Sequence, residues 1–166
     1  MLLLAVLAAV ALAGWLFFRN TQTALPKGTV LYSDTNTRQL GRPLVSHRHR
    51  LTGRPDYLVD TRHGVVPVEV KSARCPRRGP REGDVAQVLA YCLLVEDVLG
   101  TRVPHAIIQY ADTERTIAYG RAERETLLAL LAEIRGSRYY ATLHRSHVNA
   151  ARCRACGYRV TCGEDL

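Results

Sequence analysis

Two neighbouring apolar runs that carry charged side chains constrain the fold of this chain more than any other feature. The first run covers residues 55–59, with Asp56 at its head, and the second covers residues 66–70 and continues into Lys71. Successive strand residues point to opposite faces of a sheet, so Glu69 and Lys71 project together from an otherwise apolar strand. Burying a carboxylate and an ammonium is costly unless they pair, bind a metal or take part in chemistry. We therefore expect a functional site at the end of this strand.

The spacing of the acidic residues indicates a cation site. Asp56 lies 13 residues before Glu69, and a turn predicted at residues 63–64 places both carboxylates at one sheet edge. Two carboxylates and the Val70 carbonyl are the oxygen ligands that Mg²⁺ or Mn²⁺ prefers. Such a metal activates water and neutralises charge on a phosphate, while Lys71 orients or deprotonates the water or stabilises the phosphate. The alternative is an ordinary ion pair between Glu69 and Lys71 on a half-exposed strand.

The first 18 residues (MLLLAVLAAVALAGWLFF) contain no charged side chain. A helix rising about 1.5 Å per residue would extend roughly 27 Å over this stretch, close to the thickness of a lipid core. No basic segment precedes it and no small-residue cleavage site follows it, which favours an uncleaved membrane anchor over a secretory signal peptide. Arg19 and Lys27 follow the run, so the positive-inside tendency predicts a single-pass protein whose C-terminal domain is cytoplasmic.

The rest of the chain is basic. The formal net charge of +8 belongs entirely to residues 19–166. This surplus predicts a polyanionic partner, either nucleic acid or an anionic membrane surface, with a merely solubilising basic surface as the alternative. The five cysteines are an odd number, which argues against a disulfide framework. Cys92 falls on the apolar face of a predicted helix, as expected of a small core residue.

The remaining pattern predicts a sheet with helices. Strands are expected at residues 28–33, 43–51, 57–59, 66–70, 105–110 and 116–119. Helices are expected at residues 84–99, from Asp84 as N-cap to a stop at Gly100, and at 121–135, with a stop at Gly136. Their apolar stripes include Leu99 and Ile134 respectively. The order of the elements indicates an α/β or α+β domain.

The first predicted helix carries two polar residues beside its apolar stripe. Gln87 and Tyr91 are four residues apart, so they share one face of the helix. This face can reach back to the end of the strand that holds Glu69. The alternative is an ordinary helix flank with a tyrosine that extends to solvent.

Four elements carry a resemblance to a known family. They are Gly53-Arg54-Pro55-Asp56, Glu69-Val70-Lys71, Gln87-x-x-x-Tyr91 and the terminal Cys153-x2-Cys156-x5-Cys162. The first three resemble the motifs of the PD-(D/E)xK nuclease superfamily, in particular its RecB-like branch, which includes the Cas4 proteins. The cysteine spacing is similar to that at the C-terminus of the Cas4 family. The resemblance covers about residues 28–164.

The resemblance implies a restriction-endonuclease-like α/β fold, with a mixed central sheet flanked by helices. It implies that Asp56 and Glu69 bind Mg²⁺ or Mn²⁺, that Lys71 assists the attacking water, and that Gln87 and Tyr91 support the site or contact DNA. The implied reaction is metal-dependent hydrolysis of phosphodiester bonds in DNA, on single strands or at DNA ends. The basic loop at residues 73–83 and the charge surplus suit a phosphate backbone independently of the resemblance.

The terminal cysteines predict a second metal site. Cys153, Cys156 and Cys162 are one ligand short of a closed four-coordinate site, and His147, or alternatively His144, is available to complete it. Such a set suits Zn²⁺ or an iron–sulfur cluster, and the family resemblance implies a [4Fe-4S] cluster. The family's fourth cysteine and a histidine come from an N-terminal helical segment, whose place the predicted anchor takes here. Reduced free thiols in a degenerate tail are the alternative.

The sequence therefore predicts four segments: an anchor at 1–18, a linker at 19–27, a nuclease-like domain at 28–143 and a cysteine-rich tail at 144–166. The expected function is that of a membrane-anchored, Mg²⁺- or Mn²⁺-dependent DNA nuclease. One alternative is a catalytically weak nucleic-acid-binding module that keeps the nuclease fold. Another is a membrane-associated scaffold whose basic face binds anionic lipid. The complete set of acidic, lysine, glutamine and tyrosine motifs favours the nuclease.

Overall fold

The computed structural model of the chain describes residues 25–33, 42–140, 144–164 and 166. The chain divides into two compact units, Met1–Leu127 and Leu128–Leu166, and each is described by itself. The predicted anchor at 1–18 and the linker up to residue 24 lie outside the described residues. Among the residues that are described, no helix is both long enough and apolar enough to cross a bilayer.

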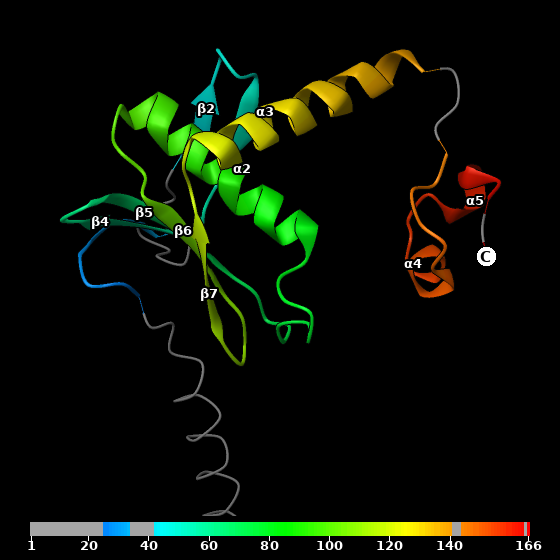
Figure 1. Cartoon of the computed structure of the whole chain (residues 1–166), viewed down its shortest axis with the longest axis horizontal. Helices are drawn as coiled ribbons and strands as arrows, with labels where there is room; N and C mark the ends of the chain where they lie inside the picture. The colour runs from blue at the N-terminus through cyan, green and yellow to red at the C-terminus, as the bar shows by residue number, and fades with distance from the viewer. Residues whose placement is uncertain (1–24, 34–41, 141–143, 165) are drawn as a thin grey trace, which may run out of the picture. The chain divides into compact units, whose positions relative to one another are not determined.

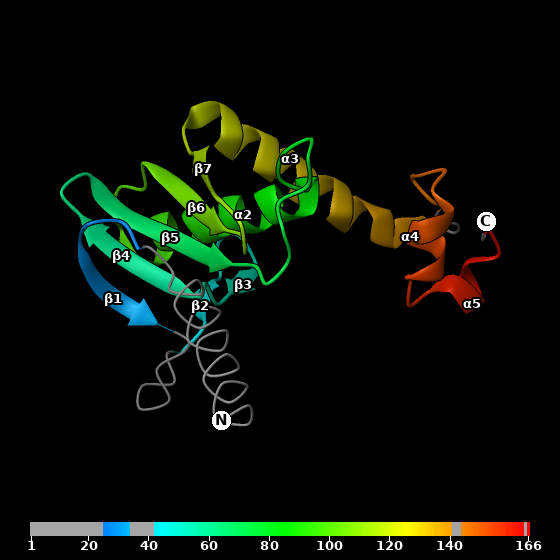
Figure 2. The same cartoon turned by 90° about the horizontal axis from the view of Figure 1, so that it is seen from below.

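A five-stranded mixed sheet forms the centre of the first unit (Figure 1, Figure 2). Its strands lie in the order β1 (Thr29–Ser33), β4 (Tyr57–Thr61), β5 (Gly64–Val70), β6 (His105–Gln109) and β7 (Glu114–Ala118). Strands β5 and β6 are parallel, and the other neighbours are antiparallel. A parallel pair needs a crossover connection, which helix α2 (Glu82–Leu99) supplies. The predicted mixed α/β architecture is confirmed.

Helix α2 crosses one face of the sheet and contacts β5, β6 and β7 (Figure 1). Its buried apolar residues are Val88, Leu89, Cys92, Leu93, Leu94 and Val95. It ends as predicted at Gly100, whose φ of 61° is the left-handed conformation that glycine adopts without strain. Two predictions for this helix are wrong. Its N-cap is Arg81 rather than Asp84, whose side chain has other partners, and Leu99 is 45% exposed because the buried face ends before the last turn.

The single strand predicted at 43–51 is wrong. Two short strands, β2 (Leu44–Ser46) and β3 (Leu51–Gly53), form an antiparallel hairpin instead. The turn between them is closed by Arg50, which has a φ of 42° and whose N–H donates to the His47 carbonyl at 3.3 Å. His47 and His49 therefore lie in the turn between the two strands.

Ser46 fastens this hairpin to α2. Ser46 is 2% exposed. Its hydroxyl donates to Asp97 Oδ2 at 2.6 Å and accepts from the His49 N–H at 2.9 Å. Because Ser46→Ala removes both bonds in a buried place, we expect it to lower the free energy of unfolding by about 1–3 kcal/mol. Urea unfolding followed by circular dichroism measures this change. The exposed Ser72→Ala should change it by less than about 0.5 kcal/mol, and equal losses in both variants would contradict the prediction.

The opposite sheet face carries an apolar cluster. The cluster consists of Val59, Val66, Val68 and Ile107, with Leu25 and Tyr57 packed against it. Strand β5 is therefore covered on both faces, which explains its nearly continuous apolar run. Glu69 is the exception, and it lies on the face that α2 covers.

The second unit contains the end of α3 (Arg121–Gly136), a 3₁₀ turn (Ser137–Tyr139), α4 (Ala150–Arg154) and α5 (Arg159–Cys162). As predicted, α3 ends at Gly136, which has a right-handed φ of −61°, and the chain continues directly into the 3₁₀ turn. Ile134, expected on the apolar stripe of α3, is 55% exposed. The Asn149 side chain caps α4 by accepting from the backbone N–H groups of Ala151 and Arg152.

Candidate active site

The candidate site lies where β4 begins and β5 ends. These strands are antiparallel and pair Tyr57 with Val68, so Asp56 and Glu69, the next residues along, are brought to the same sheet edge. The N–H of Val70 donates to Asp56 Oδ2 at 2.7 Å, which fixes the aspartate against the end of β5. The hairpin thus brings together two carboxylates that are separated in the sequence.

Glu69 is the centre of a hydrogen-bonded cluster. It is 8% exposed, and its Oε1 accepts from Lys71 Nζ at 3.0 Å and from Gln87 Nε2 at 2.8 Å. Gln87 also accepts from Lys71 Nζ at 2.7 Å and donates to the Tyr91 hydroxyl at 2.8 Å. Glu69 and Lys71 share a face because of the strand period, and Gln87 and Tyr91 share a face because of the helix period.

Asp84 completes the surroundings of the lysine, a role that the sequence reasoning missed. Its Oδ1 lies 3.5 Å from Lys71 Nζ, and its Oδ2 accepts from the Tyr110 hydroxyl at 2.7 Å. Lys71 therefore has three acceptors, Glu69, Gln87 and Asp84, for its three ammonium protons. The available signal was the three-residue offset between Asp84 and Gln87, which places both on one side of α2.

The surroundings of the site shift the pKa values of its ionisable side chains. Burial raises the pKa of Glu69, and the nearby charge of Asp56 raises it further, while the hydrogen bond from Lys71 opposes this only in part. Burial acts to lower the pKa of Lys71, but the hydrogen bond and charge of Glu69 and the charge of Asp84 outweigh it, so this pKa lies above its ordinary value. Lys71 is therefore an ammonium at neutral pH. Burial also raises the pKa of Tyr91.

The chemistry of the donor set fits a hard divalent cation. The hydrogen bonds from Lys71, Gln87 and the Val70 N–H go to Oε1 of Glu69 and Oδ2 of Asp56, and each carboxylate has a second oxygen that can ligate a cation. A cation between them would relieve the repulsion that raises the pKa of Glu69. No group of three or more His, Cys, Asp and Glu side chains in the described chain is placed to hold an ion. The Val70 carbonyl is the predicted third ligand, and water is a common further ligand of such cations.

A close packing contact holds the start of this motif against α2. A Cβ at Gly53 would lie 2.9 Å from both Tyr91 Cε1 and Leu94 Cδ1, so only glycine allows this approach without a shift. Pro55, two residues later, is fully buried. Together they fix the backbone that leads into Asp56.

The second predicted site lies in the second unit, around a cavity of about 260 Å³. The cavity is lined by His144, Arg145, Ser146, His147, Cys153, Cys156, Arg159 and Cys162. Cys153 is buried, and Cys156 and Cys162 are exposed. His147 Nδ1 accepts from the Asn149 N–H at 3.2 Å, whereas His144 Nδ1 is paired with Glu164 at 2.6 Å. The predicted donors share one cavity, although in the described tail no three of them are arranged to hold an ion.

Comparison with known proteins identifies the family. A model of the PD-(D/E)XK nuclease superfamily matches residues 4–163, a match that begins inside the apolar stretch at 1–18. The solved crystal structure of SSO0001 aligns with a TM-score of 0.47 and 19% identity, over 69% of this chain and 52% of that one, so this chain spans about half of that protein's length. No curated protein matches the sequence. Because the family model covers nearly all of its length, the chain belongs to the PD-(D/E)XK nuclease superfamily.

Proposed function

We propose that the chain is a Mg²⁺- or Mn²⁺-dependent DNA nuclease of the Cas4/RecB-like type that acts on single-stranded DNA or DNA ends. One observation carries the proposal: a buried Glu69, hydrogen-bonded to Lys71 and Gln87, lies at the same sheet edge as Asp56. Membership of a nuclease superfamily supports phosphodiester hydrolysis as the reaction. A binding module or a lipid-binding scaffold has no need for this arrangement.

The residues of the site have separate roles in this proposal. When bound, the metal would activate water and neutralise charge on the phosphate, and Asp56 and Glu69 would hold it. Lys71 stabilises the charge that builds up as the water oxygen bonds to phosphorus and the bond to the leaving oxygen breaks. Its raised pKa favours this role over that of a base. Gln87 orients Glu69 and Lys71 at once, and Tyr91 in turn orients Gln87.

The full chain tests this proposal with end-labelled linear single-stranded DNA and with a circular single strand of the same length, each with Mn²⁺ or with chelator. We expect loss of the linear strand with Mn²⁺ alone, and slower loss of the circle if the substrate is a DNA end. Binding to both without cleavage of either would overturn the nuclease and favour the nucleic-acid-binding module.

We also propose that Cys153, Cys156 and Cys162, with His147, bind a [4Fe-4S] cluster or Zn²⁺. Support comes from the donor chemistry and from the single cavity that all four residues line. Metal analysis and the visible spectrum of anaerobically purified protein distinguish the two, because an iron–sulfur cluster absorbs visible light and Zn²⁺ does not.

Thiol alkylation tests the same proposal residue by residue. If the tail holds a metal, Cys156 and Cys162 should resist iodoacetamide although they are exposed, and should react fully after chelation. Cys92 is the internal control, because burial raises its pKa well above the ordinary value and the folded chain should protect it in both states. Mass spectrometry of the digested protein measures each site. Full reaction of the exposed pair before chelation, with Cys92 protected, would contradict metal binding.

We propose further that residues 1–18 anchor the chain in a membrane, with the remainder on the cytoplasmic side. The support is the uncharged apolar composition of this stretch and the positive charges that follow it. Flotation with neutral phosphatidylcholine vesicles compares the full chain with a chain that lacks residues 1–18. Equal flotation of both would overturn the anchor.

A further inference from the structure

The basic loop predicted at residues 73–83 joins β5 to α2 directly after Lys71. In the structure it spans residues 72–81, because α2 begins at Glu82. Its start continues along β6: the N–H of Lys71 donates to the Gln109 carbonyl at 2.8 Å, and the N–H of Ala111 donates to the Ala73 carbonyl at 3.1 Å. Its end returns to the site, because Asp84 lies 3.5 Å from Lys71 and 3.8 Å from Arg81. Both ends of the basic loop are therefore held at the candidate active site.

Asp112, between β6 and β7, docks the first half of the loop. Its Oδ1 accepts from the N–H of Cys75 at 2.8 Å, and its Oδ2 accepts from Arg74 Nε at 3.2 Å. The hydrogen bond from Cys75 is the main reason why the pKa of Asp112 lies below its ordinary value. This carboxylate ties the loop to a turn that lies 37 residues further along the chain.

The tip of the loop is a tight turn that presents two arginines. The N–H of Gly79 donates to the Pro76 carbonyl at 2.9 Å, so Arg77 and Arg78 occupy the two central turn positions. Gly79 has a φ of 104°, which only glycine adopts readily. Both arginines are exposed, and within the part of the chain that the structure describes no carboxylate pairs with either. Two adjacent guanidinium groups are thus displayed on a fixed turn, and no described carboxylate neutralises them.

We propose that Arg77 and Arg78 form a clamp for the phosphate backbone of the DNA strand at the active site, and that Asp112 is the positioning residue of this clamp. The proposal rests on the proposed nuclease function and adds the surface that holds its substrate. Arg77 follows Lys71 by six positions, so the clamp lies at most ~22 Å from Lys71 along the chain, a span of a few nucleotides. Guanidinium groups bind phosphate oxygens in a bidentate manner and do not read the bases.

Replacement of the two arginines tests the clamp by binding alone. Fluorescence anisotropy with a labelled single-stranded oligonucleotide, in chelator so that no cleavage occurs, compares the full chain with Arg77→Ala/Arg78→Ala. We expect roughly tenfold weaker binding at about 0.1 M salt, and a slope of log affinity against log salt that is shallower by about 1.4, because two phosphate contacts at about 0.7 each are lost.

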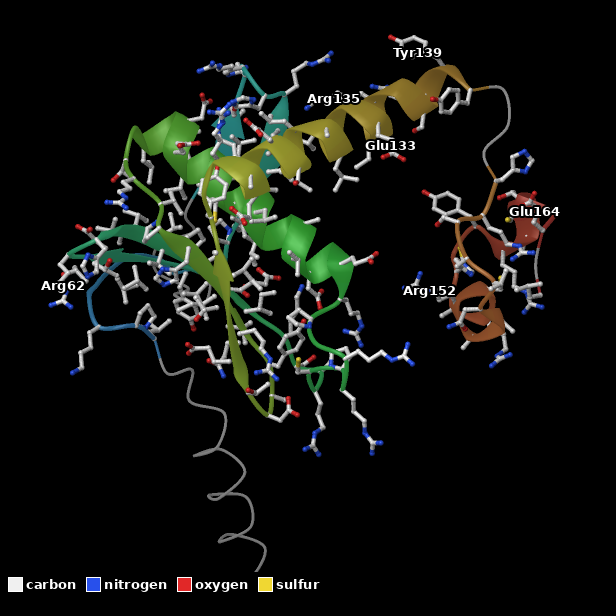
Figure 3. All side chains as sticks on the ribbon, in the orientation of Figure 1. Arg62, Glu133, Arg135, Tyr139, Arg152 and Glu164 are labelled. Atoms are coloured by element: carbon white, nitrogen blue, oxygen red, sulfur yellow. The ribbon has the colours of Figure 1, made fainter. Side chains whose placement is uncertain are left out.

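The matched control also removes two arginine charges, but at the other end of the sheet. Arg62 lies in the β4–β5 hairpin, at the end of β5 opposite to the basic loop (Figure 3). Arg102 is exposed, and its carbonyl accepts from Val65 near the same hairpin. Arg62→Ala/Arg102→Ala should keep the affinity and the slope within about twofold and about 0.3 of the unmutated chain, since it leaves the clamp intact.

Asp112 distinguishes a positioned clamp from simple charge attraction. Asp112→Ala removes a negative charge, so attraction alone predicts tighter binding to DNA. A positioned clamp predicts the reverse, about a threefold to tenfold loss, because the turn is no longer docked. Asp112→Asn keeps an oxygen for the N–H of Cys75 and should recover most of the affinity.

The outcomes separate the clamp from the nuclease. Equal loss of affinity in both double-arginine variants, or tighter binding by Asp112→Ala, overturns the clamp even if the chain cleaves DNA. Binding without cleavage overturns the nuclease and leaves the clamp standing. A chain that binds no DNA overturns both. The last arm compares vesicles of phosphatidylcholine with and without phosphatidylserine. Loss of the phosphatidylserine-dependent part of binding without loss of DNA binding in Arg77→Ala/Arg78→Ala would assign the turn to lipid instead.

Discussion

Lys71→Met should reduce DNA cleavage by about 10²–10³-fold in kcat while the affinity for DNA changes little. Methionine keeps the length and most of the packing of the side chain but removes the ammonium group. In the proposed function this group stabilises charge that develops only in the transition state, and losses of this size are typical when one such donor is removed. Initial rates with Mn²⁺ at saturating DNA give kcat, and anisotropy in chelator gives the affinity.

The chain offers a close control for this substitution. It contains two lysines and 21 arginines, and the second lysine, Lys27, is exposed. Lys27→Met removes the same charge outside the site and should leave kcat within about twofold, which bounds any effect of net charge alone. A fall in affinity with kcat unchanged in Lys71→Met would show that the lysine binds the substrate uniformly and would contradict its proposed role.

The proximity of the main site residues was predictable because it depends on the repeat of side-chain directions within one strand and one helix. A strand period of two places Glu69 and Lys71 on one face, and a helix period near four places Gln87 and Tyr91 on one face. The continuous apolar run of β5 also signals a strand covered on both sides. These rules need no knowledge of distant contacts, and the hairpin then brings Asp56 to the same edge.

The missed features depend on contacts between distant residues or on turns without a strong signal. Asp84 resembles a helix N-cap, yet Tyr110, 26 residues later, donates to it, and Arg81 begins the helix without a side-chain cap. The β2–β3 turn is closed by Arg50 in the left-handed region, where glycine or asparagine is the usual signal.

The geometry of Glu69 also indicates that the site costs stability. A carboxylate that is 8% exposed and close to a second carboxylate is held there by Lys71 and Gln87, yet its pKa remains raised. The surroundings therefore favour the neutral form even after the ion pair is included. A cation bound between Asp56 and Glu69 would reverse this preference, which couples metal binding to stability.

Glu69→Gln should lower the rate of DNA cleavage by about 10³-fold and should make the metal-free protein more stable at neutral pH. The amide keeps an oxygen that accepts from Lys71 but removes an anionic metal ligand, whose contribution to catalysis is worth several kcal/mol. Because the folded-state pKa of Glu69 lies above its ordinary value of 4.5, protonated Glu69 favours the folded state. Its stabilising contribution is complete below the unfolded-state pKa and is lost as the pH rises through the folded-state pKa.

Thermal unfolding in chelator at a series of pH values tests the second half of this prediction. The gain in Tm from Glu69→Gln should be present at neutral pH and should vanish as the pH falls below about 4.5, where Glu69 is neutral in both states. Added Mn²⁺ should raise the Tm of the unmutated chain and have little effect on the variant, because only the unmutated chain offers two anionic ligands. A variant that is less stable at neutral pH would show that the pair with Lys71 outweighs the burial of Glu69. An equal response of both proteins to Mn²⁺ would place the metal elsewhere.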